Sequence, residues 1–340
     1  MYFIPLNIER DHSKIIEGLF DFNTSSFEEK ALSVFRLQAS LNPVYLEYLR
    51  LLKIDPESIG RLCDIPFLPI SFFKTHAVVT GSFEPEAVFE SSGTTGSTTS
   101  RHRVKDLSLY RRSYEAGFEQ FYGQPQDWCI IALLPSYLER QHSSLVVMAD
   151  ALIRESGHPK SGFYLYEHDR LHQVLQDLEA AGQRTLLLGV TFALLDFAEA
   201  FPMQLKHTIV METGGMKGRR EEWTRDEVHT FLQERWGIEQ VHSEYGMTEL
   251  LSQAYSAGGG RFLPARTLRV LIRAEDDPFA IADSQAVPVR GILNLVDLAN
   301  VWSCSFIATD DAGTLYPDGS FEVRGRVDNS DIRGCSLMVV

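Results

Sequence analysis

The sequence predicts an α/β fold whose sheet is largely parallel or mixed and continues into a β-rich C-terminal part. From Ala87 onward, short apolar runs alternate with amphipathic segments, the rhythm of successive strands and helices. From about Arg266 the helical periodicity stops, and strand-like runs joined by turns follow. The N-terminal part carries helix signals instead. We therefore expect a helical part over 1–64, an α/β core over 65–265, and a β subdomain and tail of the same body over 266–340.

Capping signals predict the N-terminal helices. Ser26 and Glu29 form a capping box before an amphipathic run. Asn42-Pro43 and Asp55-Pro56 each place a capping residue before a proline at the first helical position.

Within the core, the strand and helix candidates alternate. The candidate strands are 87–90, 128–134, 161–166, 185–189, 207–211 and 239–243. The candidate helices are 107–121, 143–155, 169–181 and 224–235. The last helix opens with a capping box of Thr224 and Glu227 and ends before Gly237.

The C-terminal part reads as strands separated by turns. The strand-like runs are RTLRVLIRAE, RGILNLVDL, WSCSFIATD and SFEVRGRVD. We expect turns at Asp310-Asp311-Ala312-Gly313 and at Pro317-Asp318-Gly319.

Composition indicates a soluble protein that does not bind nucleic acid. The chain has 340 residues, 44% of them hydrophobic and 23% charged, which is ordinary for a globular protein. Its net charge of -14 would repel a phosphate backbone. The four cysteines lie far apart in sequence, so neither a disulfide framework nor a zinc site is expected.

Nothing in the sequence predicts export or a membrane span. The N-terminus MYFIPLNIERDH lacks a basic start and an apolar core, so we expect no signal peptide. The longest apolar run, 185–201, is too short to span a membrane and contains Asp196 and Glu199. We expect a cytoplasmic protein.

A loop rich in small hydroxyl side chains follows the first core strand. Residues 91–100 read SSGTTGSTTS, and basic residues follow directly, among them Arg101 and His102. Glycines let consecutive backbone N–H groups face a ligand, and hydroxyls add donors, so the loop suits a polyphosphate. It carries neither the Walker ending GK[ST] nor the G-x-G-x-x-G fingerprint. Composition alone leaves a flexible surface turn equally open.

Further motifs follow in order along the chain. Residues 212–215 read ETGG, residues 245–249 read YGMTE, residues 309–313 read TDDAG, and residues 325–329 read GRVDN. With SSGTTG, these resemble the motifs of the adenylate-forming superfamily, which includes acyl-CoA synthetases, luciferases and the adenylation domains of peptide synthetases. Asp310 replaces a glycine of the family pattern, and Asn329 replaces its second acid. The four matches SSGTTG, YGMTE, TDDAG and GRVDN lie in the family's order between residues 91 and 329, which argues against a chance resemblance.

The resemblance implies the large-domain fold of these enzymes, with ATP and Mg²⁺ as cofactors. It implies that the phosphate loop holds the β- and γ-phosphates through Ser91, Ser92, Gly93, Thr94, Thr95 and Gly96. It implies that Glu249 binds Mg²⁺ and that Thr248 contacts the α-phosphate. The resemblance also implies an adenosine site. In it, Gly214 and Gly215 would lie beside the adenine, and Tyr245, which Gly246 follows, would stack on it. Asp311 would bind the ribose hydroxyls, with Arg326 close to the same sugar.

A narrower resemblance is to the acyl-protein synthetase of bacterial luminescence. This resemblance extends from about residue 65 to the end of the chain. It rests on the segments FLPISFFK, LPSYLERQHSSLV, ETGGMKGR and the terminal DIRGCSL. It implies a fatty acid substrate and transfer of the acyl group onto Cys335. It also implies an accepting partner, which a reductase, a carrier protein or coenzyme A would satisfy. We expect Cys63, Cys129 and Cys304 to be core residues.

The chain departs from the superfamily at its end. Most members carry a further small C-terminal domain that supplies a catalytic lysine, whereas this chain stops at Val340, so we expect that domain to be absent. Lys217, or His102 and Arg101 beside the phosphate loop, are candidates for replacement positive charge.

Two other functions fit the sequence. One is a compact acyl- or aryl-CoA ligase, for which coenzyme A rather than Cys335 would be the acceptor. The other is a nucleotide-binding pseudoenzyme, for which the expected absence of the C-terminal domain is the main support. Retention of the phosphate loop together with Thr248 and Glu249 argues against it.

Overall fold

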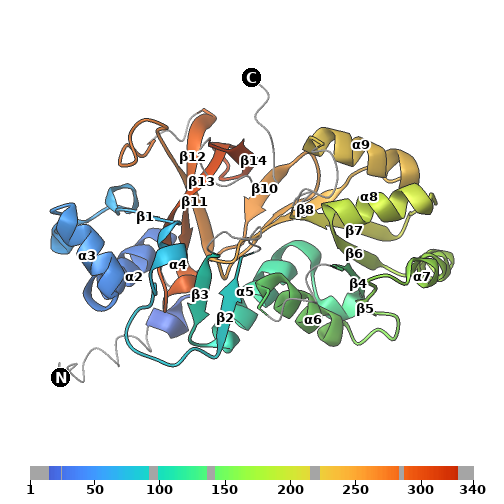
Figure 1. The fold of residues 1–340 in the computed structure, drawn as a ribbon, viewed down its shortest axis with the longest axis horizontal. Helices are drawn as coiled ribbons and strands as arrows, with labels where there is room; N and C mark the ends of the chain where they lie inside the picture. The colour runs from blue at the N-terminus through green and yellow to red at the C-terminus, as the bar shows by residue number, and fades with distance from the viewer. Residues whose placement is uncertain are drawn as a thin grey trace.

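The computed structural model describes residues 15–23, 25–91, 99–135, 142–214, 223–282 and 287–327. Most described strands join one 12-stranded sheet, and two form a separate hairpin (Figure 1). Along the large sheet the order is β11-β12-β13-β14-β10-β9-β8-β7-β6-β4-β5, with β1 beside β13. The prediction of an α/β fold with a mixed sheet is confirmed.

The large sheet divides into a parallel and an antiparallel half. The parallel half consists of β4 (Cys129–Leu133), β5 (Gly162–Phe163), β6 (Thr185–Val190), β7 (Thr208–Thr213) and β8 (His242–Tyr245). The antiparallel half continues from β8 through β9 (Ala254–Ser256), β10 (Arg261–Pro264), β14 (Phe321–Arg326), β13 (Phe306–Leu315), β12 (Val289–Asp297) and β11 (Leu268–Arg273). Strand β1 (Leu68–Pro69) runs parallel to β13, and the hairpin pairs β2 (Ala87–Glu90) with β3 (Arg101–Val104).

Helices cover both faces of the parallel half. The α-helices are α2 (Phe27–Leu41), α3 (Pro43–Leu51), α4 (Phe72–Thr75), α5 (Leu107–Tyr122), α6 (Ser144–Ser156), α7 (His168–Ala180), α8 (Thr191–Ala200) and α9 (Arg225–Trp236). Short 3₁₀ turns are η1 (Pro56–Ser58), η2 (Leu62–Asp64), η3 (Pro125–Asp127) and η4 (Leu298–Asn300). Helices α8 and α9 lie on one face of the parallel strands and α5 and α6 on the other (Figure 1). No helix within the described ranges is long and apolar enough to cross a membrane.

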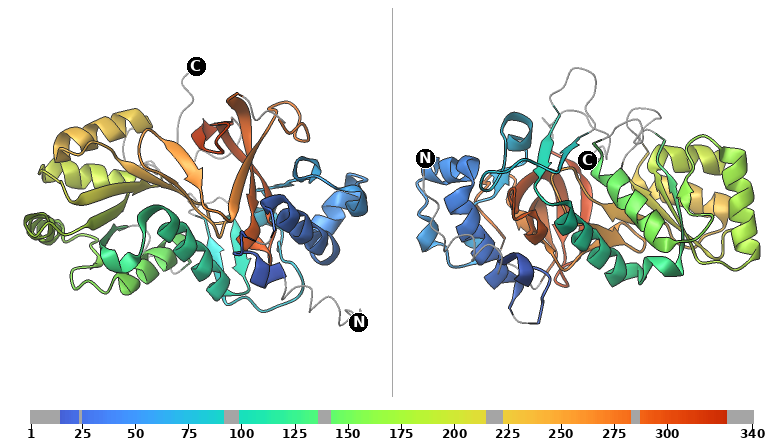
Figure 2. Two further views of the ribbon diagram at one scale, coloured as in Figure 1. Left: turned by 180° about the vertical axis from the view of Figure 1, so that it is seen from behind. Right: turned by 90° about the horizontal axis from the view of Figure 1, so that it is seen from below.

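The N-terminal helices pack against the antiparallel strands at the other end of the molecule (Figure 2). Phe35 of α2 meets Phe306 of β13 edge to face, with 5.9 Å between ring centroids. One apolar cluster contains both these helices and the C-terminal strands, and a second fills the parallel half. The first and last parts of the chain therefore share a core, and the predicted divisions at residues 64 and 265 stay predictions.

The helix caps follow the sequence signals. Both capping boxes form, at Ser26 before α2 and at Thr224 before α9. Asn42 caps α3 through its side chain, and Gly237 ends α9 with a φ of 63°. Asp55 caps only the 3₁₀ turn η1, because no helix continues beyond Ser58.

Several boundaries differ from the sequence prediction. The strand expected over 161–166 is only Gly162–Phe163, and the strand expected over 239–243 begins at His242. Helix α8 was not predicted, because the strand before it and the helix itself form one continuous apolar run that is buried almost throughout. Periodicity cannot separate a buried strand from a buried helix.

The turn predicted at Asp310-Asp311-Ala312-Gly313 is wrong, because these residues lie inside β13. Partner strands on both sides, β12 and β14, hold the segment extended, and a register shift occurs between Ala312 and Gly313. A Cβ on Gly313 would come within 2.2 Å of the Glu322 carbonyl oxygen, so glycine serves close strand packing here rather than a turn. The turn predicted at Pro317-Asp318-Gly319 forms, with Gly319 at a φ of 82°.

Candidate active site

The hydroxyl-rich loop connects the two strands of the β2–β3 hairpin, and its two ends are tied together. The N–H of Ser91 donates to the carbonyl of Ser100 at 3.1 Å, and the N–H of Ser100 donates to Oγ of Ser91 at 2.9 Å. The residue before Ser91 and the residue after Ser100, Glu90 and Arg101, form an ion pair at 3.1 Å. The other five predicted phosphate-loop residues, Ser92 to Gly96, lie outside the described residues.

A buried histidine joins this hairpin to the YGMTE motif. His102 of β3 is 1% exposed, and its Nδ1 lies 2.9 Å from the carbonyl oxygen of Thr248. Phe73 and Phe89 pack edge to face against the ring. The root of the hydroxyl-rich loop therefore lies directly against the segment predicted to contact the α-phosphate.

Burial keeps this imidazole neutral. Desolvation lowers the pKa of His102 to about 4, although its hydrogen bonds to Thr248 and Asn300 oppose the shift. The expectation that His102 supplies positive charge is therefore wrong, because the ring is uncharged near pH 7 and holds the Thr248 backbone instead. Lys217, the other candidate, lies outside the described residues, and Arg101 is engaged with Glu90.

Three predicted adenosine residues from three different strands meet in one hydrogen-bonded group. Oη of Tyr245 donates to Oδ2 of Asp311 at 2.8 Å, and Nε of Arg326 donates to Oδ1 of the same carboxylate at 3.2 Å. Asp311 and Arg326 are direct partners across β13 and β14. Burial, and then the Asp311 charge, raise the pKa of the Tyr245 phenol well above its usual value. We name these three residues the carboxylate clamp.

The ring of Tyr245 is held by two phenylalanines that sequence reasoning missed. Phe321 of β14 packs edge to face against it at 5.5 Å, and Phe262 of β10 lies at 5.8 Å. Neither belongs to a motif, and only the apolar strand pattern around them was visible in the sequence. They place Tyr245 at the junction of the two sheet halves, while its stacking on adenine stays a prediction.

The segment after Tyr245 is anchored by buried polar side chains. Glu249 is 5% exposed, and its carbonyl accepts a hydrogen bond from Nδ2 of Asn300 at 2.7 Å. Nε2 of Gln38 in α2 in turn donates to the Asn300 carbonyl at 3.1 Å. Gln38 and Asn300 are 262 positions apart, and Asn300 and Glu249 are 51 apart, so no local sequence pattern could have revealed these contacts.

A buried aspartate organises the chain just beyond Glu249. Asp297 accepts hydrogen bonds from the backbone N–H groups of Leu251 and Ser252 at 2.7 and 3.0 Å. It also accepts from the Ser252 hydroxyl and from the N–H of Ala299. Burial raises the pKa of Asp297, while these hydrogen bonds oppose the rise. Nothing in the sequence marks this aspartate beyond its place at the end of a strand-like run.

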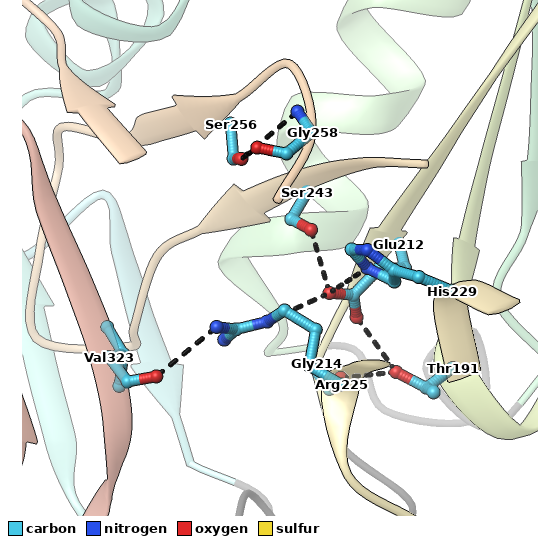
Figure 3. Close-up of polar contacts among 9 residues, drawn as sticks. All are labelled: Thr191, Glu212, Gly214, Arg225, His229, Ser243, Ser256, Gly258 and Val323. Carbon is cyan, nitrogen blue, oxygen red and sulfur yellow. Dashed lines mark hydrogen bonds and ion pairs between the residues drawn. The ribbon is translucent and has the colours of Figure 1, made fainter. Parts of the chain in front are cut away.

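The end of β7 carries a second carboxylate network (Figure 3). Glu212 accepts hydrogen bonds from Thr191 at 3.0 Å and Ser243 at 2.9 Å, and lies 3.9 Å from Arg225. The Thr191 hydroxyl also donates to the carbonyl of Gly214 at 2.6 Å. Predicted adenine-loop residue Gly214 is thus positioned beside the parallel strand that carries Tyr245, whereas Gly215 lies outside the described residues.

The remaining predicted residues are one glycine and four cysteines. Gly246 is exposed, and a Cβ there would lie 2.5 Å from Oε1 of Glu244, so a larger residue would require the Glu244 side chain to move. Cys129 and Cys304 are buried as expected, and burial raises their thiol pKa values to about 11 and about 12. Cys63 is only half-buried, at a 3₁₀ turn, so its assignment to the core is wrong. Cys335 lies outside the described residues.

A protein-family model for the acyl-protein synthetase LuxE matches residues 20–340. The chain belongs to the LuxE acyl-protein synthetase family. Family membership confirms the predicted resemblance and the prediction of an AMP-forming ligase. No curated protein matches the chain.

Solved structures of adenylate-forming ligases resemble this one. A 2-hydroxyisobutyryl-CoA ligase bound to an acyl-adenylate is 12% identical with a TM-score of 0.60, and the match covers 98% of this chain and 74% of that one. A long-chain-fatty-acid-CoA ligase from Archaeoglobus fulgidus is 14% identical with a TM-score of 0.49, covering 71% and 51%. O-succinylbenzoate coenzyme A synthetase from Bacillus subtilis, in complex with ATP and magnesium, is 17% identical with a TM-score of 0.48, covering 72% and 50%. The chain spans about half the length of the last two.

The neutral His102 predicts a pH dependence of stability. Its folded pKa of about 4 lies below the ordinary 6.5, so the unfolded chain binds a proton that the folded chain does not. The stability contributed by the neutral ring is complete above pH 6.5 and is lost as the pH falls from 6.5 toward 4. When the pH falls from 7 to 5, the free energy of unfolding of the wild type should decrease by about 2 kcal/mol more than that of the His102→Gln variant. Urea unfolding of both proteins at each pH measures this, and parallel losses would contradict the buried neutral ring.

Proposed function

We propose that this chain activates a carboxylic acid with ATP, forming an acyl-adenylate and pyrophosphate. A carboxylate oxygen of the substrate would attack the α-phosphorus, and the bond from that phosphorus to the pyrophosphate oxygen would break. The observation that carries the proposal is the hydrogen bond from His102 to the Thr248 carbonyl, which holds the root of the hydroxyl-rich loop against the YGMTE motif. Catalysis of such a step depends mainly on positioning and on charge stabilisation.

The phosphate loop, Ser91 to Gly96, would hold the departing pyrophosphate through its hydroxyl and N–H groups. Thr248 would contact the α-phosphate, since its backbone is held beside the loop. Lys217 would add positive charge. Each assignment rests on the family motifs and on the junction between the β2–β3 hairpin and the YGMTE segment.

A magnesium ion fits this arrangement through Glu249. No group of three metal-ligating side chains occurs among the described residues. Magnesium commonly takes one or two carboxylates and completes its shell with phosphate oxygens and water. Glu249 offers such a carboxylate, and a bound ion would neutralise charge on the phosphates.

The carboxylate clamp would bind the adenosine part. Asp311 has two oxygens that already accept hydrogen bonds from Tyr245 and Arg326, and each carboxylate oxygen can accept another. It can therefore also receive the ribose hydroxyls. Gly214, which follows β7, would border the adenine together with Gly215, and Tyr245 would stack on the adenine.

We further propose that the activated acid is a fatty acid and that its acyl group passes to Cys335. The Cys335 thiolate would attack the acyl carbonyl carbon and expel AMP. Two of the described cysteines are poor competitors, because burial raises the pKa of the Cys129 thiol to about 11 and that of Cys304 to about 12. From Cys335 the acyl group would move to a partner such as a reductase, a carrier protein or coenzyme A.

Adenylation predicts exchange of labelled pyrophosphate into ATP that depends on an added carboxylic acid. The Glu249→Gln variant should lower the exchange rate about 10²-fold or more, because the carboxylate that neutralises the transition state through magnesium is lost. Glu239→Gln, which changes an exposed glutamate in the turn before β8, is the matched control and should retain the wild-type rate. ATP binding without exchange for any short, long or aromatic acid would reject adenylation and favour a nucleotide-binding pseudoenzyme.

Transfer to Cys335 predicts a covalent acyl-protein. Incubation with ATP, magnesium and a radiolabelled acid should label wild type with a thioester that neutral hydroxylamine removes, and Cys335→Ser should abolish that label. Cys63→Ser is the control, because Cys63 is the most exposed of the described cysteines. Full thioester labelling of Cys335→Ser would contradict the assignment, and rapid AMP release by that variant only with coenzyme A would favour a CoA ligase.

A further inference from the structure

Three neighbouring polar side chains beside the YGMTE motif are buried with few hydrogen bonds. Glu244 of β8 is 8% exposed, Gln253 is 4% exposed and Tyr255 of β9 is 3% exposed. Oε1 of Gln253 and Oη of Tyr255 have no hydrogen-bond partner among the described residues. A buried polar atom without a partner is costly, so such atoms call for an explanation.

Strand register places the three on one face of the sheet. Glu244 and Tyr255 are direct partners across the antiparallel pair β8–β9, and Gln253 precedes Tyr255 by two residues. A Cβ built on Gly246 would lie 2.5 Å from Oε1 of Glu244 and 3.8 Å from Cγ of Gln253, so these two side chains converge over Gly246. The ring of Tyr255 lies 3.8 Å from a Cβ built on Gly117 of α5, so this is the face that α5 covers.

The Glu244 carboxyl group takes few hydrogen bonds. Within the described residues its carboxyl group takes one hydrogen bond, from the Thr213 hydroxyl to Oε2 at 2.5 Å. Burial, together with the nearby charge of Glu212, raises the pKa of Glu244 to about 7. In its protonated form the group can both donate and accept a hydrogen bond.

Other tyrosines close to Glu244 show that the fold can satisfy such hydroxyls. Oη of Tyr110 donates to the Ser144 carbonyl at 3.0 Å, and Oη of Tyr122 lies 3.1 Å from Nδ1 of His242. The Glu244 charge raises the pKa of both phenols and of Tyr255, which places all three near its carboxyl group. Of these three phenols only that of Tyr255 lacks a partner in the described chain.

We propose that Glu244, Gln253 and Tyr255 form a polar subsite that binds a hydroxyl group on the acyl chain of the substrate. This rests on the proposed adenylation, and it narrows the substrate from a plain fatty acid to a hydroxylated one. Gly246 lies two residues before Thr248. The acyl chain of a substrate whose carboxylate faces the α-phosphate would therefore begin beside Glu244 and Gln253, which converge over Gly246.

The chemistry of the three groups favours a hydroxyl over a charged substituent. A group that reaches Gln253 has to donate to its Oε1, and a group that reaches Tyr255 or protonated Glu244 can accept a hydrogen bond from it. A hydroxyl group does both at once, whereas an ammonium group only donates. A site built to hydrogen-bond a hydroxyl also rejects the analogue that lacks it, because its own polar atoms are then left unpaired.

The test compares pyrophosphate exchange for a straight-chain acid with acids of equal length that carry a hydroxyl group at each successive carbon. At least one hydroxy acid should have a kcat/KM about tenfold or more above the plain acid. That ratio should fall toward one in Glu244→Leu and in Tyr255→Phe. Tyr122→Phe is the matched control, because its hydroxyl already bonds to His242, and it should keep the ratio.

The outcomes separate this inference from the function on which it rests. Equal or better exchange with the plain acid, or a clear preference for an amino acid of the same length, would overturn the hydroxyl subsite and leave adenylation intact. Exchange with none of the acids would remove adenylation and the subsite together.

A second measurement needs no substrate. In the ligand-free protein, Tyr255→Phe deletes a buried hydroxyl without a partner, so its urea midpoint should equal or exceed that of wild type. Tyr122→Phe deletes a bonded hydroxyl and should lower the midpoint. A loss in Tyr255→Phe as large as in Tyr122→Phe would show that the Tyr255 hydroxyl is already satisfied, and the proposal would fail.

Discussion

The Asp311 carboxylate, shared by Tyr245 and Arg326, is the interaction on which the candidate site depends. Tyr245 ends the last parallel strand, whereas Asp311 and Arg326 belong to antiparallel strands β13 and β14. The clamp therefore joins the two halves of the sheet at the point where predicted adenosine-binding residues meet. Its hydrogen bonds are charge-assisted, and such bonds are stronger than those between neutral groups.

The remaining contacts converge on the same junction from three directions. His102 brings the hydroxyl-rich hairpin to the Thr248 backbone, and Asn300 brings α2 to the Glu249 backbone through Gln38. Glu212 organises the end of β7 on the opposite face of the sheet from Glu244. Parallel strands gather their carboxyl ends at one edge, so the last of them is where side chains from both halves can meet.

Local chemistry decided what the sequence could predict. Capping boxes at Ser26 and Thr224 and the ordered motifs led to correct helix starts and to the correct family, because each depends on residues close together in the chain. The turn predicted at residues 310–313 failed because pairing on both sides of β13 overrides the preference of Asp and Gly for turns. The charged state expected for His102 failed because its burial depends on residues distant in sequence, such as Phe73 and Thr248.

A double-mutant cycle on the carboxylate clamp tests the central claim most directly. ATP affinity would be measured by calorimetry for wild type, Tyr245→Phe, Arg326→Ala and the double variant. If Asp311 binds the nucleotide while held by both partners, the two losses should be non-additive by about 1 kcal/mol or more, since each substitution acts on the same carboxylate. Additive losses, or unchanged affinity in all three variants, would show that the nucleotide does not depend on this junction.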